Sequence, residues 1–196
     1  TFVASRTPRP KVDLGKATFS TDLSTLAESQ DVDVIVEAIG GDDDAKTLFE
    51  QAIENGKHLV TANKALIALH GNDLLRKAEK KGLSVGFEAA VAGGIPIINA
   101  LTRGLAANRI EWLAGIINGT SNYILTAMSQ EGRNFREALE EAQKLGYAEA
   151  DPTFDIEGID AAHKLAILAG LAFSTPFDFA SVHTEGISDV NIEDIG

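Results

Sequence analysis

An aspartate and a lysine, Asp160 and Lys164, stand four residues apart in a segment whose apolar residues recur at helical spacing. Positions i and i+4 lie on one face of a helix, so an acid that precedes a base at this spacing can pair with it. Burial penalises a lysine ammonium while a neighbouring carboxylate stabilises it, and this opposition is common at catalytic sites. Two interpretations are open: a buried structural ion pair, or a functional lysine at a catalytic site.

Two further carboxylates precede this pair. Glu149 and Asp155 lie in an irregular segment that contains Pro152. Lys164 is the single Lys or Arg after Lys144, in a stretch rich in acids. Carboxylates beside a buried lysine suit the binding of a small substrate that carries an ammonium group. A solvated polar loop is the alternative.

Three segments rich in glycine or polar residues follow short apolar runs that are typical of strands. They are Gly40-Gly41, Thr61 to Lys64, and Glu88 to Pro96. Parallel sheets bind ligands where the carboxyl ends of their strands meet loops and helix N-termini. We therefore expect a cofactor contact at Gly40, Asn63 and Lys64. The alternatives are an ordinary tight turn for the glycine pair and a solvated helix-start lysine for Lys64.

The first seven residues are typical of a strand that runs into a loop, with Arg6 near its end. At the second strand of a dinucleotide-binding fold, an acid binds the ribose 2′-hydroxyl of NAD, whereas an arginine accommodates the 2′-phosphate of NADP. Arg6 therefore favours NADP over NAD, with Arg9 as a second candidate. An exposed surface arginine is the alternative.

The elements that must position these residues alternate in the first half of the chain. Runs at 32–36, 58–61 and 83–87 predict strands, and helical patterns at 45–55 and 64–81 predict helices. This order predicts an α/β doubly wound, Rossmann-type nucleotide-binding domain over residues 1–92, with a parallel sheet covered on both faces. The sequence contains no G-x-G-x-x-G phosphate turn. We therefore expect the first βα unit to be missing from this chain.

The second half changes character after Glu88. Pro96 is typical of a helix start, so a helix is predicted over 96–107. Further helices are predicted over 120–130, 134–145 and 158–173, and strands over 109–117 and 182–188. We interpret residues 93–196 as an α+β domain, separated from the first by a cleft and truncated at its C-terminal end.

The composition limits the class of protein. The 196 residues carry a formal net charge of −12 and are 44% hydrophobic, which excludes a disordered or collagen-like chain. The absence of cysteine excludes disulfides and Cys-ligated zinc or iron–sulfur sites. Excess acid argues against nucleic acid as a partner, and no apolar run approaches the roughly 20 residues of a membrane span. A cytoplasmic protein is expected.

Five segments together resemble the homoserine dehydrogenase family, in the order in which that family carries them. They are Val36 to Gly41, Thr61 to Ala68, Glu88 to Pro96, Gly115 to Leu125, and Gly146 to Lys164. The resemblance implies an oxidoreductase that interconverts L-homoserine and L-aspartate 4-semialdehyde with NADP or NAD, in the biosynthesis of threonine and methionine.

The resemblance also implies roles for individual residues. Lys164 is the proton donor to the aldehyde oxygen, Asp160 positions it, and Lys64 approaches both the nicotinamide and the substrate. The substrate is then bound by Glu149, Asp155, Tyr147, Gly119 and Thr120.

A monovalent cation and a partner subunit belong to the same resemblance. Glu88 and the backbone carbonyls of Val91, Gly93 and Ile95 match the family's cation site, usually sodium. Oxygen ligands of this kind suit a hard cation. Family members dimerise through the second domain, so a homodimer is expected.

Two other interpretations remain open. The chain can be a catalytically silent dimerisation or scaffold fragment of this fold. It can also belong to a related dehydrogenase that acts on another small amino or hydroxy acid.

Overall fold

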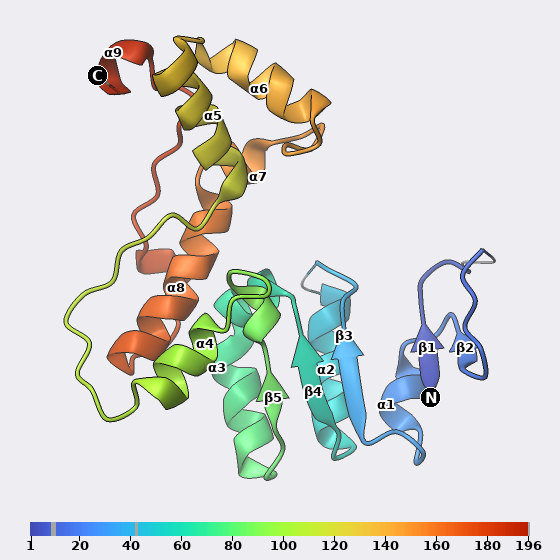
Figure 1. Cartoon of the computed structure of the whole chain (residues 1–196). Helices are drawn as coiled ribbons and strands as arrows, with labels where there is room; N and C mark the ends of the chain where they lie inside the picture. Colours follow the sequence, from blue (N-terminus) through green and yellow to red (C-terminus); the bar gives the residue numbers. More distant parts are fainter. Residues whose placement is uncertain (9–10, 42, 196) are drawn as a thin grey trace. The chain divides into compact units, whose positions relative to one another are not determined.

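The computed structural model describes residues 1–8, 11–41 and 43–195. Arg9 therefore lies outside the described residues. The chain divides into two compact units (Figure 1). Unit 1 comprises Thr1–Asn108 with Thr175–Phe177, and unit 2 comprises Arg109–Ser174 with Asp178–Gly196. The domain boundary after residue 92 stays a prediction, and the structural division falls after Asn108.

Unit 1 contains two parallel sheets. Strands β1 (Phe2–Ala4) and β2 (Thr18–Ser20) form one, and β3 (Val34–Glu37), β4 (His58–Thr61) and β5 (Val85–Gly86) form the other in that order. Its helices include α1 (Ser24–Glu28), α2 (Asp43–Glu54) and α3 (Lys64–Lys80). The predicted parallel arrangement of the three central strands is confirmed.

The two sheets fit a recognisable strand order. In the doubly wound order 3-2-1-4-5-6, strands 3 and 2 lie on one side of strand 1, and strands 4, 5 and 6 lie on the other. The pair β1-β2 and the sheet β3-β4-β5 correspond to these two groups.

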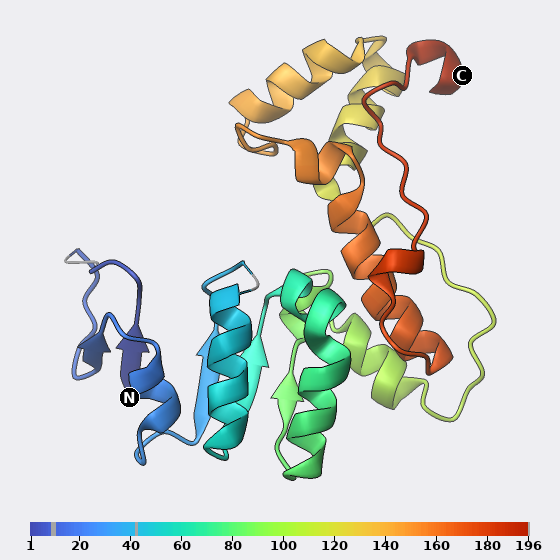
Figure 2. The same cartoon turned by 180° about the vertical axis from the view of Figure 1, so that it is seen from behind.

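Side chains alternate across the three-stranded sheet, as the pleat requires. Ile35 and Leu59 are buried in a core that also contains Phe49. Figures 1 and 2 show α2 and α3 on the same face of this sheet. On its other face, Val34 and Val36 are 50% and 71% exposed. The expectation of cover on both faces is therefore wrong for the described residues, because no described helix packs over these valines.

Unit 1 continues past its sheet through a short 3₁₀ turn, η1 (Glu88–Ala90), and a helical segment. This segment is α4 (Ile97–Asn99) followed by a π-helical turn, η2 (Ala100–Gly104). Leu105 N donates to Ala100 O at 2.8 Å, which closes the wider turn. The helix predicted over 96–107 is thus present but shorter.

The described part of unit 2 is built from helices (Figure 1). They are α5 (Gly119–Glu131), α6 (Phe135–Lys144), α7 (Thr153–Ile156), α8 (Ile159–Phe173), η3 (Phe179–Ser181) and α9 (Ile192–Ile195). Helices α5 and α6 pack around Ile124, Met128 and Ala138. Asparagines cap both: Asn118 accepts a hydrogen bond from Ser121 N, and Asn134 forms a capping box with Glu137.

The strands predicted at 109–117 and 182–188 are wrong for the described chain. Both segments are irregular, and neither pairs with another described segment as a strand. Trp112 and Ile116 are 76% and 79% exposed, although their residue types favour a sheet. Ile187 N donates instead to Ile156 O at 2.8 Å, next to α8. An alternating apolar pattern becomes a strand only where a partner supplies the ladder of hydrogen bonds.

Candidate active site

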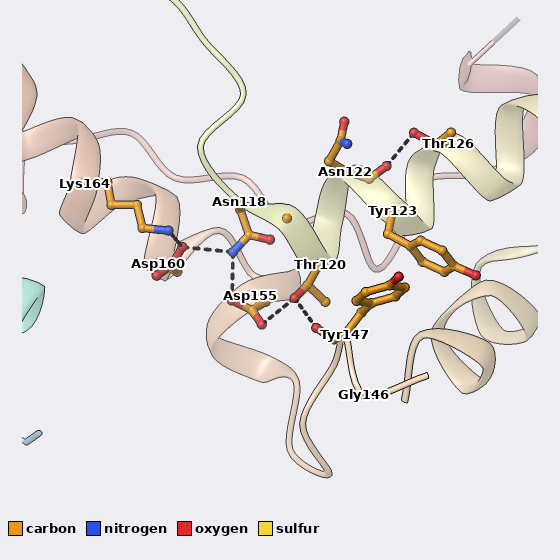
Figure 3. A pocket seen from close by; sticks show the side chains of 11 residues that line it. Asn118, Thr120, Asn122, Tyr123, Thr126, Gly146, Tyr147, Asp155, Asp160 and Lys164 are labelled. Carbon is orange, nitrogen blue, oxygen red and sulfur yellow. Dashed lines mark hydrogen bonds and ion pairs between the residues drawn. The ribbon is translucent and has the colours of Figure 1, made fainter. Parts of the chain in front are cut away.

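A pocket of about 640 Å³ lies in unit 2 where the N-terminus of α5 meets α7 and α8 (Figure 3). The pocket brings together most of the residues that the sequence singles out in this half of the chain. They are Gly119, Thr120, Tyr147, Asp155, Asp160 and Lys164. These residues come from four separate segments, so the fold and not the local sequence assembles the pocket.

Lys164 and Asp160 contact each other as their spacing predicts. Lys164 Nζ donates to Asp160 Oδ2 at 2.6 Å and to the carbonyl oxygen of Ile117 at 2.8 Å. The lysine side chain is 18% exposed and the aspartate side chain 5%. A lysine ammonium has three N–H donors. Two of them are thus aimed at fixed acceptors, and the ammonium still borders the pocket.

Asp155, on α7, is held against the start of α5. Thr120 Oγ1 lies 3.0 Å from Asp155 Oδ2 and 2.7 Å from the carbonyl oxygen of Tyr147. Ser121 Oγ donates to the backbone carbonyl of Asp155 at 3.0 Å. These contacts fix a carboxylate at the pocket wall close to the lysine.

Glu149 is not brought to this pocket. Its side chain is exposed, and its backbone carbonyl accepts a hydrogen bond from Gln143 Nε2 at 3.0 Å. Its place in the substrate site stays a prediction.

Several pocket residues were missed by the sequence reasoning. Asn118, Asn122, Tyr123 and Thr126 also line the pocket. Asn118 precedes a helix at the position where an asparagine is typical of an N-cap, and this signal was available in the sequence. Residues 122 and 126 are polar and four apart, which places them on one helix face.

Tyr123 and Tyr147 form the aromatic wall of the pocket, with ring centroids 5.0 Å apart (Figure 3). Tyr123 Oη donates to Glu141 Oε2 at 3.0 Å. Desolvation, and then the hydrogen bond to Glu141, raise the pKa of the Tyr123 phenol above its usual value. Tyr123 therefore remains a neutral hydrogen-bond donor throughout the physiological pH range.

In unit 1, the loop after β3 gathers the residues expected to bind a cofactor. Arg6 Nη2 donates to the carbonyl oxygen of Ile39 at 3.3 Å, and Asn63 Nδ2 donates to the carbonyl oxygen of Gly41. Asn63 also caps α3 by accepting from Leu66 N at 3.0 Å, which places Lys64 as the first residue of that helix. Arg6, Gly40, Asn63 and Lys64 thus lie at the carboxyl edge of their strands.

A buried carboxylate, Glu37, organises this loop and was also missed. Its side chain accepts hydrogen bonds from Ile39 N at 2.7 Å and Gly40 N at 3.2 Å, and from the Thr61 hydroxyl. Glu37 is only 2% exposed. An acid at the end of an otherwise apolar strand is the signal that could have identified it, because a buried charge needs partners.

Glu88 is engaged with the start of α4. Its carboxylate accepts from Ile98 N at 2.8 Å, Asn99 N at 3.0 Å and Asn99 Nδ2 at 2.6 Å. Between them the chain turns through left-handed conformations at Ala92 and Gly93. No group of three or more His, Cys, Asp or Glu that could hold a metal ion occurs within residues 1–8, 11–41 and 43–195. Nor does any helix in those ranges have the length and apolar character needed to cross a membrane.

Gly158 connects Asp155 on α7 to Asp160 on α8, and its backbone is left-handed, with φ +77°. A Cβ at this position would lie 3.0 Å from the carbonyl oxygen of Glu185 and 3.1 Å from Thr184 Cγ2. Gly132, at the end of α5, has φ +68° and no such neighbour within 4 Å. We expect Gly132→Ala to cost about 1 kcal/mol of unfolding free energy, from the left-handed backbone alone. Gly158→Ala should cost a further ~1–3 kcal/mol from the close approach.

Urea unfolding of the two variants, followed by circular dichroism, checks this expectation. Equal losses of unfolding free energy in the two variants would show that residues 184–185 move aside without destabilising the fold.

Comparison with known proteins gives consistent results for both units. The family model for the NAD-binding domain of homoserine dehydrogenase matches residues 1–88, and the homoserine dehydrogenase family model matches residues 96–196. The homoserine dehydrogenase of Pseudomonas aeruginosa is 58% identical over 193 residues, which are 98% of this chain and 44% of that protein. The Bacillus subtilis homoserine dehydrogenase is 49% identical over 94% of this chain and 43% of its own length.

Solved structures agree. A homoserine dehydrogenase from Thiobacillus denitrificans has a TM-score of 0.89 and 58% identity, over 91% of this chain and 42% of that one. A hyperthermophilic archaeal homoserine dehydrogenase in complex with NADPH has a TM-score of 0.79 and 31% identity, over 89% of this chain and 54% of that one. The chain thus spans less than half the length of the curated relatives named above.

Proposed function

Because the chain belongs to the homoserine dehydrogenase family, we propose that it carries the substrate site of an oxidoreductase that interconverts L-homoserine and L-aspartate 4-semialdehyde. The observation that carries the proposal is the pocket of unit 2, where the Lys164–Asp160 pair and the Asp155 carboxylate line one cavity. An ammonium beside carboxylates matches a substrate with one reacting oxygen and one amino group.

The chemistry follows from the charge that develops on the substrate. A nicotinamide cofactor, when bound, supplies the hydride that reduces the aldehyde carbon or accepts it in the reverse direction. Negative charge then builds on the oxygen, where the Lys164 ammonium stabilises it and delivers a proton. In homoserine oxidation the same nitrogen accepts the hydroxyl proton. Asp160 holds the ammonium in place through the 2.6 Å contact.

The carboxylate of Asp155 is proposed to bind the substrate's amino group. Glu149, which lies outside the pocket lining, is proposed as a second substrate contact from the loop that precedes α7. Gly119, Thr120 and Tyr147 shape the same wall. Lys64, at the start of α3, is proposed to approach the nicotinamide and the substrate.

The direct test uses the natural gene product that contains this sequence. Oxidation of L-homoserine with NADP or NAD is measured beside oxidation of 4-hydroxybutyrate, which has the hydroxyl and carboxylate but no amino group. We expect homoserine turnover and little turnover of the analogue. Equal turnover would contradict ammonium recognition, and activity on neither compound would contradict the proposed reaction.

We propose that the cofactor is NADP in preference to NAD, and the position of Arg6 at the loop after β3 supports this. An arginine offers donors to a 2′-phosphate that the NAD ribose lacks. Arg6→Ala should lower kcat/KM for NADPH by roughly tenfold, the value of one charged hydrogen bond, and leave that for NADH nearly unchanged. Arg136→Ala, at an exposed arginine of α6, is the control. Parallel losses with both cofactors would exclude the proposed role of Arg6.

A monovalent cation, sodium, is proposed at Glu88 and the carbonyls of Val91, Gly93 and Ile95. The donor chemistry supports it, because one carboxylate and turn carbonyls suit a hard cation. The left-handed residues Ala92 and Gly93 lie within this turn. Enzyme activity measured with sodium and with choline, a cation too large for such a site, checks the proposal.

We also propose a cytoplasmic homodimer formed through the second domain. The exposed side chains of Trp112 and Ile116 support a partner on that segment. Sedimentation of the natural gene product measures its oligomeric state, and cell fractionation its location.

A further inference from the structure

Asn118 occupies the centre of the hydrogen-bond network around the pocket (Figure 3). Its Nδ2 donates to Asp155 Oδ1 at 2.7 Å and to Asp160 Oδ2 at 2.9 Å. Its Oδ1 accepts from Ser121 N at 2.7 Å. Asn118 is 8% exposed, so nearly all of its side chain is removed from water. One amide group thus joins the N-terminus of α5 to carboxylates on α7 and α8.

The orientation of this amide is fixed by its neighbours. A backbone N–H such as that of Ser121 can only donate, so the carbonyl oxygen of Asn118 must face it. The NH₂ group must then face the two carboxylates, and each of its protons has an acceptor. A flipped amide would turn its oxygen toward two carboxylates. The network therefore has one satisfied arrangement.

This arrangement couples two groups with different tasks. Asp160 Oδ2 accepts from both Asn118 and Lys164, and the neighbouring carbonyl of Ile117 accepts from the same lysine. Asp155 is reached by the second proton of the Asn118 amide. Two carboxylates that share one donor repel each other, and the NH₂ group between them offsets this repulsion.

We propose that Asn118 is a positioning residue that holds the ammonium-binding carboxylate Asp155 in register with the Asp160–Lys164 pair. This inference rests on the proposed function of the pocket. Asn118 acts through Asp155 and Asp160 and not on the substrate itself.

Two substitutions separate positioning from helix capping. Asn118→Ser and Asn118→Asp both retain a side-chain oxygen that can cap α5, because serine and aspartate are good N-cap residues. Both remove the NH₂ donor, and the aspartate also adds a negative charge beside two carboxylates. The matched control is Asn134, which caps α6 in the same unit by accepting from Glu137 N at 3.0 Å. Asn134→Ser and Asn134→Asp retain that cap.

We expect Asn118→Ser to lower kcat/KM for homoserine by roughly tenfold to a hundredfold, as for loss of a hydrogen bond to a charged group. Asn118→Asp should lower it further, because it adds repulsion. The Asn134 variants should stay within about twofold of the parent, since no pocket contact changes. The melting temperature should fall for Asn118→Ser, because Asp155 and the buried Asp160 lose a donor, and should stay near that of the parent for Asn134→Ser.

The pH profile of kcat for homoserine oxidation is the readout that a purely structural role would not move. The titratable groups that line the pocket with Lys164 are Asp155 on α7, Asp160 on α8, Tyr123 on α5, and Tyr147. Without the Asn118 donor, the Asp160 carboxylate attracts the Lys164 ammonium more strongly. Homoserine oxidation needs Lys164 to accept the hydroxyl proton, so it should require a higher pH. The pH at which kcat rises should increase in the order parent, Asn118→Ser, Asn118→Asp.

Three results would overturn the proposal. Asn118 variants that match their Asn134 counterparts in kcat/KM and pH profile would exclude a positioning role. Loss of activity with a lower melting temperature and an unmoved pH profile would assign Asn118 to capping alone. A parent protein without homoserine turnover would remove the proposed function and this inference with it, whereas an active parent with unaffected Asn118 variants would remove the inference alone.

Discussion

Replacement of Lys164 by alanine is expected to lower kcat for homoserine oxidation by roughly 10²–10⁴-fold, the range for loss of a general acid or base. The reason is geometric: the Lys164 Nζ is held by Asp160 and the Ile117 carbonyl at the edge of the pocket. No other lysine or arginine lines this pocket in the described chain. Steady-state kinetics in both directions measures the effect.

Two further variants make the Lys164 prediction specific. Lys164→Arg keeps a positive charge that does not deprotonate, so it should retain substrate binding but not the rate. Lys144→Ala, at the exposed end of α6, is the control and should leave kcat unchanged. If Lys64→Ala instead causes the larger fall in kcat while Lys164→Ala changes only KM, the roles of the two lysines are exchanged.

The second large effect concerns stability. Asp160→Ala should lower the free energy of unfolding by about 3 kcal/mol, the lower end of the range for breaking a buried ion pair. The lower end applies because Lys164 keeps the Ile117 carbonyl as a partner. The same substitution leaves one Nδ2 proton of Asn118 without its acceptor. Urea unfolding followed by circular dichroism measures the loss.

The chain contains a matched control for this prediction. Arg136 and Glu140 form an ion pair at the same i,i+4 spacing on α6, but their side chains are 88% and 53% exposed. Glu140→Ala should cost only about 0.3–0.5 kcal/mol, as surface pairs do. A loss at Asp160 no larger than that at Glu140 would falsify the claim that burial makes the Asp160–Lys164 pair important for stability.

Local sequence signals predicted the parallel half of the fold well. β4 lies at 58–61 as expected, and α2 and α3 begin and end within a few residues of their predicted limits. Strands in such units are short apolar runs between turns, and glycines end the helices, so the necessary information is local. Whether helices cover both faces of the sheet could not be predicted from local signals, because it depends on which distant segments pack against each face.

The strands expected at 109–117 and 182–188 failed for a related physical reason. Side-chain types around Trp112 favour an extended backbone, yet a strand is a pairing of two segments and not a property of one. The described residues of unit 2 supply no partner strand.

The candidate site, like the fold, was predictable where its contacts are local in the sequence and not where they join distant segments. The spacing of Asp160 and Lys164 on one helix was sufficient to predict their contact. The roles of Asn118 and Glu37 could not be predicted from local spacing, because each side chain contacts residues far along the chain. Asn118 reaches Asp160 across 42 positions, and Glu37 reaches Thr61 across 24. Glu149, chosen because it lies with Asp155 in the loop before the lysine, is not among the residues that line the pocket, because the path of that loop is not encoded in local spacing.

The separation of unit 1 into two sheets has a practical consequence for handling the purified chain. Strand β3 pairs only with β4, and β1 only with β2, so each has a border of backbone amides and carbonyls that no described strand occupies. An unpaired strand edge can pair with an extended segment of a neighbouring molecule. The exposed side chains of Val34 and Val36 on β3 add apolar contact area. Concentrated stocks should therefore grow sheets from molecule to molecule, and dilute storage should delay this polymerisation.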